Sequence, residues 1–324
     1  MEQVRSARKF GIAVVLLTLL FRLFELGLPQ LAFGLLPRLF PSSIQKETER
    51  QVRSFSFPFP FESSPPMDYV PEPRLPVFTA QDAQAVTVVN SSGEEPDYEA
   101  LMAAPLAWQL DSGKPTVLIL HTHTSESYEK GSGDYQETAA YRTLEEGYNM
   151  LSIGDRLAEC LEEAGIRVIH DRQFHDYPAY STAYTHARRS IQQLLKENPG
   201  IQLVLDLHRD AADDGGGQLC TAFQAEGSSC AQLMLVLGAG NAGLPNGHWE
   251  TNLSLAMKLQ TVLQKQNSAL CRPISLRAQR FNQDLAPYAL LVEVGAAGDS
   301  REAALKAAEE LAKGIIKLKH GTLR

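Results

Sequence analysis

Short apolar runs alternate with amphipathic stretches from about residue 116 to the C-terminus. The runs are rich in Val, Ile and Leu, as is typical of parallel strands that are covered on both faces. The stretches between them have apolar residues at helical spacing. Strands that alternate with helices predict an α/β fold, with a mostly parallel sheet flanked by helices. The expected strands are 117–120, 166–169, 201–207 and 288–294, and the expected helices are 150–164, 179–197, 249–266 and 300–319.

The first forty residues have a different pattern. Basic residues precede an apolar stretch at 10–21, and a second apolar run follows at 26–36 after two charged residues. No small-x-small cleavage site follows, which favours an uncleaved membrane anchor over a removed signal peptide. An amphipathic or buried helix is the alternative. The leading basic residues predict a cytoplasmic tip, so that a single-pass protein would expose everything after about residue 40 outside the cytoplasm.

A proline-rich stretch at 55–76 follows, with little periodic hydrophobicity. Such composition favours extended, poorly packed chain. We therefore expect three parts: a cytoplasmic tip and anchor at 1–40, an extracytoplasmic linker at 41–115, and a folded domain at 116–324. The folded domain should begin somewhere between Val88 and Thr116.

Composition narrows the class of protein. Hydrophobic residues make up 44% of the chain and charged residues 21%, as in an ordinary globular protein. The formal net charge is −8, and no block of basic residues interrupts the body. A protein that binds nucleic acid needs clustered positive charge for the phosphates, so this charge pattern argues against a nucleic-acid-binding protein.

The chain has four cysteines without Cys-x-x-Cys spacing, which argues against a thiolate zinc site. Cys220 and Cys230 flank an expected hairpin of 219–224 and 232–237. Outside the cell this arrangement admits a disulfide, and two free buried thiols are the alternative.

Three expected strands end in chemically active side chains. The first is followed by His121 and His123, another by His208, and the last carries Glu293. A single histidine at a strand end is more often structural. Because the carboxyl ends of parallel strands line one edge of a sheet, however, these side chains can meet there. The combination predicts a metal site, and the donor types indicate a zinc hydrolase.

Several motifs stand out together along the chain: His121-Thr-His-Thr-Ser-Glu-Ser-Tyr128, His170-Asp171, His175-Asp176, Asp206-Leu-His-Arg-Asp-Ala211, Asn282-Gln-Asp-Leu285 and Leu291-Val-Glu-Val-Gly295. Taken together, these motifs resemble the stage II sporulation protein P family, membrane-anchored peptidoglycan hydrolases of endospore-forming bacteria. The same strand ends are similar to those of the zinc-dependent N-acetylmuramoyl-L-alanine amidases, which implies an amidase-like fold.

The amidase resemblance implies a ligand set for zinc. His123 takes the position of the first ligand, His208 that of the last, and Glu145 that of the carboxylate ligand, four residues before an Asn-Leu-like helix start. Two points stay open. His121 could replace or support His123, and Glu126 could compete with Glu145, whose alternative role is an acidic residue in a first helical turn.

The resemblance also implies roles in catalysis. Glu293 matches the catalytic glutamate, which would take a proton from a zinc-activated water and return it to the leaving amine. Its alternative is to orient a histidine ligand. Arg209 could polarise the scissile carbonyl, stabilise the oxyanion or bind a peptide carboxylate, and its alternative is a structural salt bridge. His175, Asn282 and Gln283 are candidates for substrate binding.

The expected function is peptidoglycan hydrolysis during engulfment, in the space between two membranes. The bond would be the amide between N-acetylmuramic acid and L-alanine, with a further endopeptidase activity on the stem peptide. Family resemblance alone suggests stage II sporulation proteins D and M as partners. One alternative is a membrane-tethered module that binds or activates without cutting. A soluble metallopeptidase is a weaker one, because the chain has no His-Glu-x-x-His helix.

Overall fold

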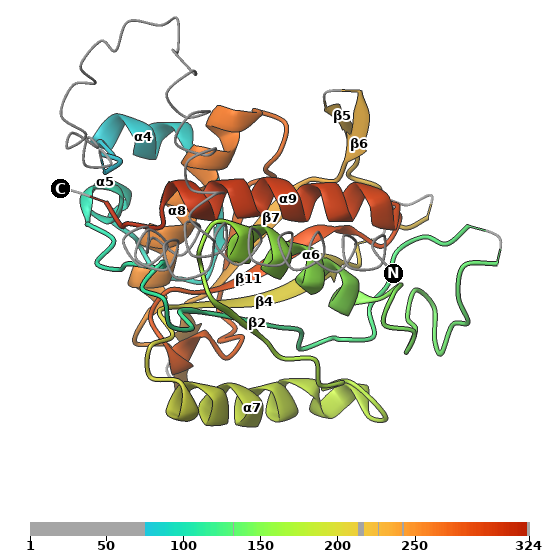
Figure 1. Ribbon diagram of the computed structural model, residues 1–324. Helices are drawn as coiled ribbons and strands as arrows, with labels where there is room; N and C mark the ends of the chain where they lie inside the picture. The colour runs from blue at the N-terminus through green and yellow to red at the C-terminus, as the bar shows by residue number, and fades with distance from the viewer. Residues whose placement is uncertain (1–74, 132, 213–216, 226, 242, 323–324) are drawn as a thin grey trace, which may run out of the picture. The chain divides into compact units, whose positions relative to one another are not determined.

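A mixed β-sheet lies at the centre of the described part of the chain (Figure 1). The structure is a computed structural model that describes residues 75–131, 133–212, 217–225, 227–241 and 243–322. These residues belong to one unit, which extends from Pro73 to Arg324. Within them, seven strands pair in the order β1-β10-β7-β11-β4-β2-β3. In chain order the strands are β1 (Val88–Ser91), β2 (Val117–Leu120), β3 (Val168–His170), β4 (Leu203–Asp210), β7 (Leu233–Gly238), β10 (Ile274–Arg277) and β11 (Ala289–Ala296).

The predicted mostly parallel sheet is confirmed. Within this sheet neighbouring strands run parallel, apart from the antiparallel pairing of β7 with β11. The described residues also form two small antiparallel pairs outside the sheet. These are β5 (Phe223–Ala225) with β6 (Ser228–Cys230), and β8 (Gly240–Asn241) with β9 (Leu244–Pro245).

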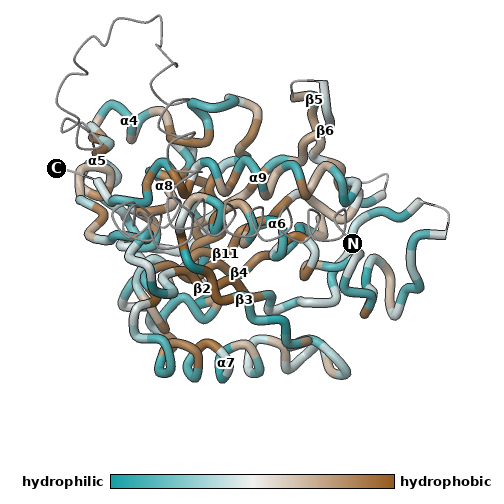
Figure 2. Tube along the Cα trace, in the orientation of Figure 1, coloured by the Kyte–Doolittle hydropathy of each residue, from teal (hydrophilic) through white to brown (hydrophobic). Residues whose placement is uncertain are grey.

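Helices cover both faces of the sheet (Figure 1). One face packs against α6 (Met150–Glu163), α8 (Trp249–Gln266) and α9 (Arg301–Lys317), which share the larger hydrophobic core with it. The other face packs against α7 (Ala183–Glu197), preceded by the short 3-10 helix η1 (Tyr180–Thr182). Figure 2 shows the apolar strands between these layers and the polar outer side of α7. The prediction of flanking helices is therefore confirmed.

Helix α6 illustrates why the sequence folds in this way. Its apolar residues Met150, Ile153, Leu157 and Leu161 are fully buried, as their helical spacing predicts. The side chain of Asn149 accepts a hydrogen bond from the backbone N–H of Leu151 and caps the helix start. After the helix the chain turns at Gly165, whose φ of 83° suits glycine.

The expected hairpin is wrong in its second strand. β5 pairs with β6, whereas 233–238 forms β7 in the main sheet. Every residue of β7 is buried, so this apolar run belongs between two layers rather than in a surface hairpin. Cys230 lies opposite Phe223, and both Cys230 and Cys220 are free thiols.

The folded unit begins earlier than the expected boundary at residue 116. Part of the segment expected as linker forms α4 (Ala80–Ala85), strand β1 and α5 (Tyr98–Ala103), and β1 extends the sheet by pairing with β10. The expected anchor and most of the linker, residues 1–74, lie outside the described residues. Among the described helices, none is long and apolar enough to cross a membrane.

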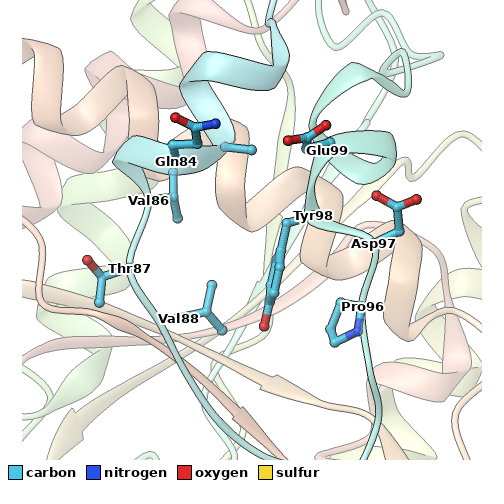
Figure 3. A pocket seen from close by; sticks show the side chains of 9 residues that line it. Gln84, Val86, Thr87, Val88, Pro96, Asp97, Tyr98 and Glu99 are labelled. Atoms are coloured by element: carbon cyan, nitrogen blue, oxygen red, sulfur yellow. The ribbon is translucent and has the colours of Figure 1, made fainter.

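A surface hollow of ≈ 530 Å³ lies where α4, β1 and α5 meet. Figure 3 shows Val86, Val88 and Tyr98 among the side chains that line it. None of the side chains selected by the sequence analysis lines this hollow.

Candidate functional site

The register of the sheet places Glu293 beside His208. The two residues are paired on the neighbouring parallel strands β11 and β4, so their side chains point to the same face. Asp206 lies two residues before His208 and shares that face, since side chains alternate along a strand. The same face packs against α7. Two strand ends that are distant in sequence therefore present a histidine and two carboxylates together.

The loop after β2 brings a second histidine to this group. Asp206 holds the loop by accepting hydrogen bonds from Thr122, at 2.7 Å from its backbone N and 2.6 Å from its Oγ1. The next residue, His123, then lies with its ring centroid 5.2 Å from that of His208, at an interplanar angle of 86°. Glu126 follows, with its Oε2 3.6 Å from Nδ1 of His208.

A buried arginine fixes the charge of Glu126. Nη1 of Arg209 lies 3.5 Å from Oε1 of Glu126. Burial alone would raise the pKa of Glu126, but the Arg209 guanidinium and His208 lower it to about 2. Arg209 also donates hydrogen bonds to the carbonyls of Ser127 and Tyr141. Its side chain is only 4% exposed, so it faces the loop rather than solvent.

Three buried polar atoms around this cluster have no hydrogen-bond partner among the described residues: Nδ1 of His123, Nε2 of His208 and Oε2 of Glu293. Nε2 of His208 does lie 3.0 Å from Asp206, as an ion pair without hydrogen-bond alignment. Buried polar groups are normally satisfied, so the unpartnered Nδ1 of His123 and Oε2 of Glu293 indicate a bound ion or a catalytic role. Within the described ranges, however, no three His, Cys, Asp or Glu side chains stand close enough to enclose one ion.

Burial also perturbs the titration of these groups. It raises the pKa of Glu293 to about 7 and lowers that of His123 to about 4. For His208, burial opposes protonation, but the Asp206 carboxylate raises the pKa well above its ordinary value. Such shifts, concentrated in one cluster, are typical of functional sites.

His121 lies apart from this cluster. Its Nε2 is 2.8 Å from Nε2 of His170, and its Nδ1 is 3.2 Å from the carbonyl oxygen of Leu207. A Cβ added to Gly154 of α6 would come within 2.6 Å of Nε2 of His121, so the imidazole packs under α6. Burial lowers its pKa to about 3. The structure does not bring His121 to the face that carries His208.

Glu145 is also absent from the cluster. It is exposed, and its Oε1 accepts a hydrogen bond from the backbone N–H of Gln136. Between the two carboxylates that the sequence analysis left open, the structure brings Glu126 to His208.

The candidate substrate-binding residues have internal partners. Nε2 of His175 lies 3.0 Å from Asp171. The amide of Gln283 accepts from the backbone N of Gly238 and donates to the carbonyl of Val236. Asn282 donates to the carbonyl of Tyr184 at the start of α7. His175 and Asn282 thus hold segments beside the cluster, whereas Gln283 holds its own segment to strand β7.

The sequence analysis did not select several residues that contact the site. Tyr180 stacks on His123 at 4.3 Å between ring centroids, and the edge of Tyr184 faces the same imidazole at 5.6 Å. The guanidinium of Arg142 lies 3.8 Å from the centroid of Tyr180. No sequence motif marks these three, because they come from a loop and from the start of a helix. Asp206 could have been found, since alternation along a strand places it beside His208.

Comparison with known proteins gives one curated relative and several solved structures. Stage II sporulation protein P of Bacillus subtilis (strain 168) is 25% identical over 267 residues, which cover 78% of this chain and 60% of that protein. This chain therefore spans about 60% of the length of that curated relative. Among solved structures, the N-acetylmuramoyl-L-alanine amidase AmiC2 of Nostoc punctiforme is 16% identical, with a TM-score of 0.38, over 62% of this chain and 96% of that chain. An N-acetylmuramoyl-L-alanine amidase from Clostridium difficile 630 is 15% identical, with a TM-score of 0.39, over 64% and 97%.

A family comparison covers most of the chain. The model of the family described as stage II sporulation protein P (SpoIIP) matches residues 36–316. The match includes the strand ends, the loop after β2 and the helices that pack on them. The chain belongs to the stage II sporulation protein P family.

Proposed function

We propose that this chain is a zinc-dependent peptidoglycan hydrolase of sporulation. The observation that carries the proposal is the meeting of His123, His208 and Glu126 at one end of the sheet, next to the buried carboxylate of Glu293. Membership of the stage II sporulation protein P family supports the sporulation setting.

The residues fit a catalytic zinc centre by chemistry. Two imidazoles and one carboxylate make up a three-ligand set of the kind that leaves a position open for water. Nδ1 of His208 and Oε2 of Glu126 are 3.6 Å apart. Two atoms that bind the same tetrahedral zinc ion at ordinary bond lengths are about 3.4 Å apart, so the observed distance is close to that of two zinc ligands. Asp206 sits on the other ring nitrogen of His208, where a carboxylate fixes the orientation of a liganding imidazole. We therefore assign His123, Glu126 and His208 as ligands, with Glu126 in place of Glu145 and His121 as a packing residue.

Bound zinc would supply a nucleophilic water at neutral pH, because it lowers the pKa of water from about 15.7 to about 7. Glu293 serves as the base. Its Oε2 is buried and without a hydrogen-bond partner among the described residues, and burial holds its pKa near neutrality, at about 7. An acid–base group is most effective when its pKa lies near the working pH. The same oxygen would then deliver the proton to the nitrogen of the leaving amine.

Arg209 takes a positioning role in this proposal. Its donors already bind Ser127 and Tyr141 and face Glu126, so they hold the ligand loop instead of a substrate carbonyl. His175, Asn282 and Gln283 act in the same indirect way, through the segments that they hold.

The family resemblance suggests which bond is cut, where the protein acts and which partners it has. We propose that the substrate bond is the amide between N-acetylmuramic acid and L-alanine, with a second, endopeptidase activity on the stem peptide. The setting would be the intermembrane space during engulfment, with anchoring through residues 1–40 and with stage II sporulation proteins D and M as partners.

The test is hydrolysis of isolated cell wall by the purified full-length protein, with and without a chelator. We expect zinc-dependent release of peptides with free L-alanine amino termini. Glu293→Gln should keep its zinc and lose about 10²- to 10⁴-fold in turnover, the usual contribution of a general base. His208→Ala should lose both zinc and hydrolysis.

The alternative function is a module that binds cell wall without cutting it. The lack of a closed three-ligand group among the described residues favours this alternative. If the wild-type protein sediments with cell wall but releases no peptide at any zinc concentration, the hydrolase proposal fails and the binding module stands.

A further inference from the structure

A stack of three planar groups leads outward from the candidate zinc ligand His123. Its imidazole is 8% exposed, and the ring of Tyr180 lies on it at a centroid distance of 4.3 Å and an interplanar angle of 16°. The guanidinium carbon of Arg142 lies 3.8 Å from the centroid of the same tyrosine ring. Tyr180 itself is 48% exposed. Tyr180 therefore connects the buried cluster with the solvent-accessible surface, and Arg142 lies between the two.

The position of Arg142 is fixed by its backbone. The residue forms an antiparallel bridge with Glu126, and its backbone N–H donates to the carbonyl of Ala139. Cation–π stacking on Tyr180 then orients the plane of the guanidinium. The side chain is thus held in place without using its own hydrogen-bond donors.

Those donors make no hydrogen bond within the described residues, although the guanidinium pairs loosely with Glu126. The nearest carboxylate oxygen is Oε1 of Glu126 at 3.9 Å, which is too far for a hydrogen bond. Arg209 already lies closer to that oxygen, at 3.5 Å, so Glu126 has its compensating charge without Arg142. Stacking occupies the face of a guanidinium and leaves the N–H groups at its edge available, in the fork geometry that matches a carboxylate. The side chain of Arg142 is 20% exposed, enough to be reached from solvent.

We propose that Arg142, held by Tyr180, is a specificity-determining residue that binds a free carboxylate of the peptide substrate. The inference rests on the proposed hydrolase function and adds the chemistry of its substrate. Nη2 of Arg142 lies 3.9 Å from Oε1 of Glu126, one of the proposed zinc ligands, so a carboxylate that Arg142 binds lies close to the amide that is cut. The preferred substrate therefore has a carboxylate within about two residues of that amide, since extended peptide spans about 3.3–3.6 Å per residue.

The test compares two probes that differ in one group. The first is N-acetylmuramoyl-L-alanyl-D-glutamate with its side-chain carboxyl capped as a methylamide, and the second has its α-carboxylate converted to a carboxamide. The full-length protein is loaded with zinc, and kcat and KM are measured for the wild type and for Arg142→Gln. We expect the wild type to prefer the carboxylate probe about 10- to 100-fold in kcat/KM, as suits a charged hydrogen bond. The preference should appear mainly in KM and should disappear in Arg142→Gln, which should cut the carboxamide probe as the wild type does.

Further variants separate recognition from structure. Arg189→Gln removes the same charge from the exposed side of α7 and should keep the wild-type preference. Tyr180→Phe preserves the stack and should retain the preference, whereas Tyr180→Leu should reduce it. An equal loss on both probes in Arg142→Gln, or an undiminished preference, would overturn the inference.

A binding measurement keeps this result apart from the fate of the hydrolase proposal. The affinity of both probes is measured by calorimetry on Glu293→Gln, with and without Arg142→Gln. If the wild type cuts neither probe but the carboxylate probe still binds more tightly in an Arg142-dependent manner, the hydrolase fails and the carboxylate site stands. If hydrolysis occurs but neither binding nor KM depends on the carboxylate, the hydrolase proposal stands and the carboxylate site fails.

Discussion

Glu126 combines deep burial with a full negative charge. A carboxylate in such surroundings persists only when paired, and here Arg209 and His208 lower its pKa to about 2 against the effect of burial. It therefore stays ionised at neutral pH, which is the state required of a metal ligand. Glu145, exposed and bonded to a backbone N–H, has no such surroundings.

The two glutamates give a matched prediction. Loss of a residue that only hydrogen-bonds a metal ligand lowers metal affinity about 10- to 100-fold. Glu126→Gln removes a proposed ligand itself and should weaken zinc binding by more than this. Glu145→Gln should leave zinc affinity within about twofold, because its surroundings are those of a solvated side chain. Competition against a chromogenic chelator measures both, and thermal unfolding checks that each variant is folded. Equal losses, or a larger loss for Glu145→Gln, would contradict the assignment.

At the residue scale, the histidine pair shows what a sequence can reveal. His208 and Glu293 could be predicted to share a face, because both lie on strands and side chains alternate. The choice between His121 and His123 could not be made from the motif. His121 continues the alternation of β2 and packs under α6, whereas His123 sits in a loop whose path depends on hydrogen bonds from Thr122 to Asp206.

Among the elements, α6 depends on a close approach to the sheet at Gly154. A Cβ there would come within 2.4 Å of Nε2 of His170 and 2.6 Å of Nε2 of His121. Helix interiors normally favour alanine over glycine by about 1 kcal/mol. The glycine is therefore explained by the two imidazoles beneath the helix.

Gly154→Ala should accordingly destabilise the protein, by ~1–3 kcal/mol from overpacking. Gly147→Ala is the control, since a Cβ at Gly147 meets nothing within 4 Å. Urea unfolding measures both variants. A Gly154→Ala protein as stable as wild type, or more stable, would show that α6 can move away from the histidine pair.

Helix α8 carries a buried cation. Lys258 is 1% exposed, and its ammonium donates to the carbonyl of Leu101 in α5 and to the hydroxyl of Ser254. Burial lowers its pKa to about 8, from an ordinary value of 10.5. Below pH 8 the lysine is charged in both folded and unfolded chains, so the folded state bears the full cost of burying the charge. Between pH 8 and 10.5 the unfolded chain binds more protons, and stability rises.

Relative to Lys258→Met, the wild type should therefore gain ~1–3 kcal/mol of unfolding free energy between pH 7.5 and about pH 10. Chemical denaturation of the two proteins across this range measures the difference. Subtraction cancels the other titrating groups, which the proteins share. A pH-independent difference would mean that the buried ammonium keeps an ordinary pKa.

The elements differ in how far the sequence predicts them. Helix α8 has the predicted bounds, because its ends coincide with the ends of the periodic pattern. Strand β1 has no pattern typical of a buried strand, since three of its four residues are exposed, as suits an edge strand. The apolar run of β7 fits a hairpin as well as the main sheet, because a short apolar run carries no information about which strand it pairs with.

At the scale of the whole molecule, the order of strands and helices predicts the layered α/β arrangement, and the carboxyl ends of β4 and β11 predict where the chemistry lies. The geometry of the loops could not be predicted from the sequence. The positions of Glu126, Arg142 and Tyr180 depend on contacts between segments that are far apart in the chain, and no local pattern encodes them.

The central claim is that one strand, β4, and the loop after β2 share a single zinc ion beside Glu293 of β11. Anomalous diffraction at the zinc edge, from crystals of the zinc-loaded protein, tests it directly. We predict one strong peak within bonding distance of His123, Glu126 and His208, with the carboxylate of Glu293 facing the open position. A protein that takes up no zinc, or a peak bound by the imidazoles of His121 and His170 instead, would contradict the account.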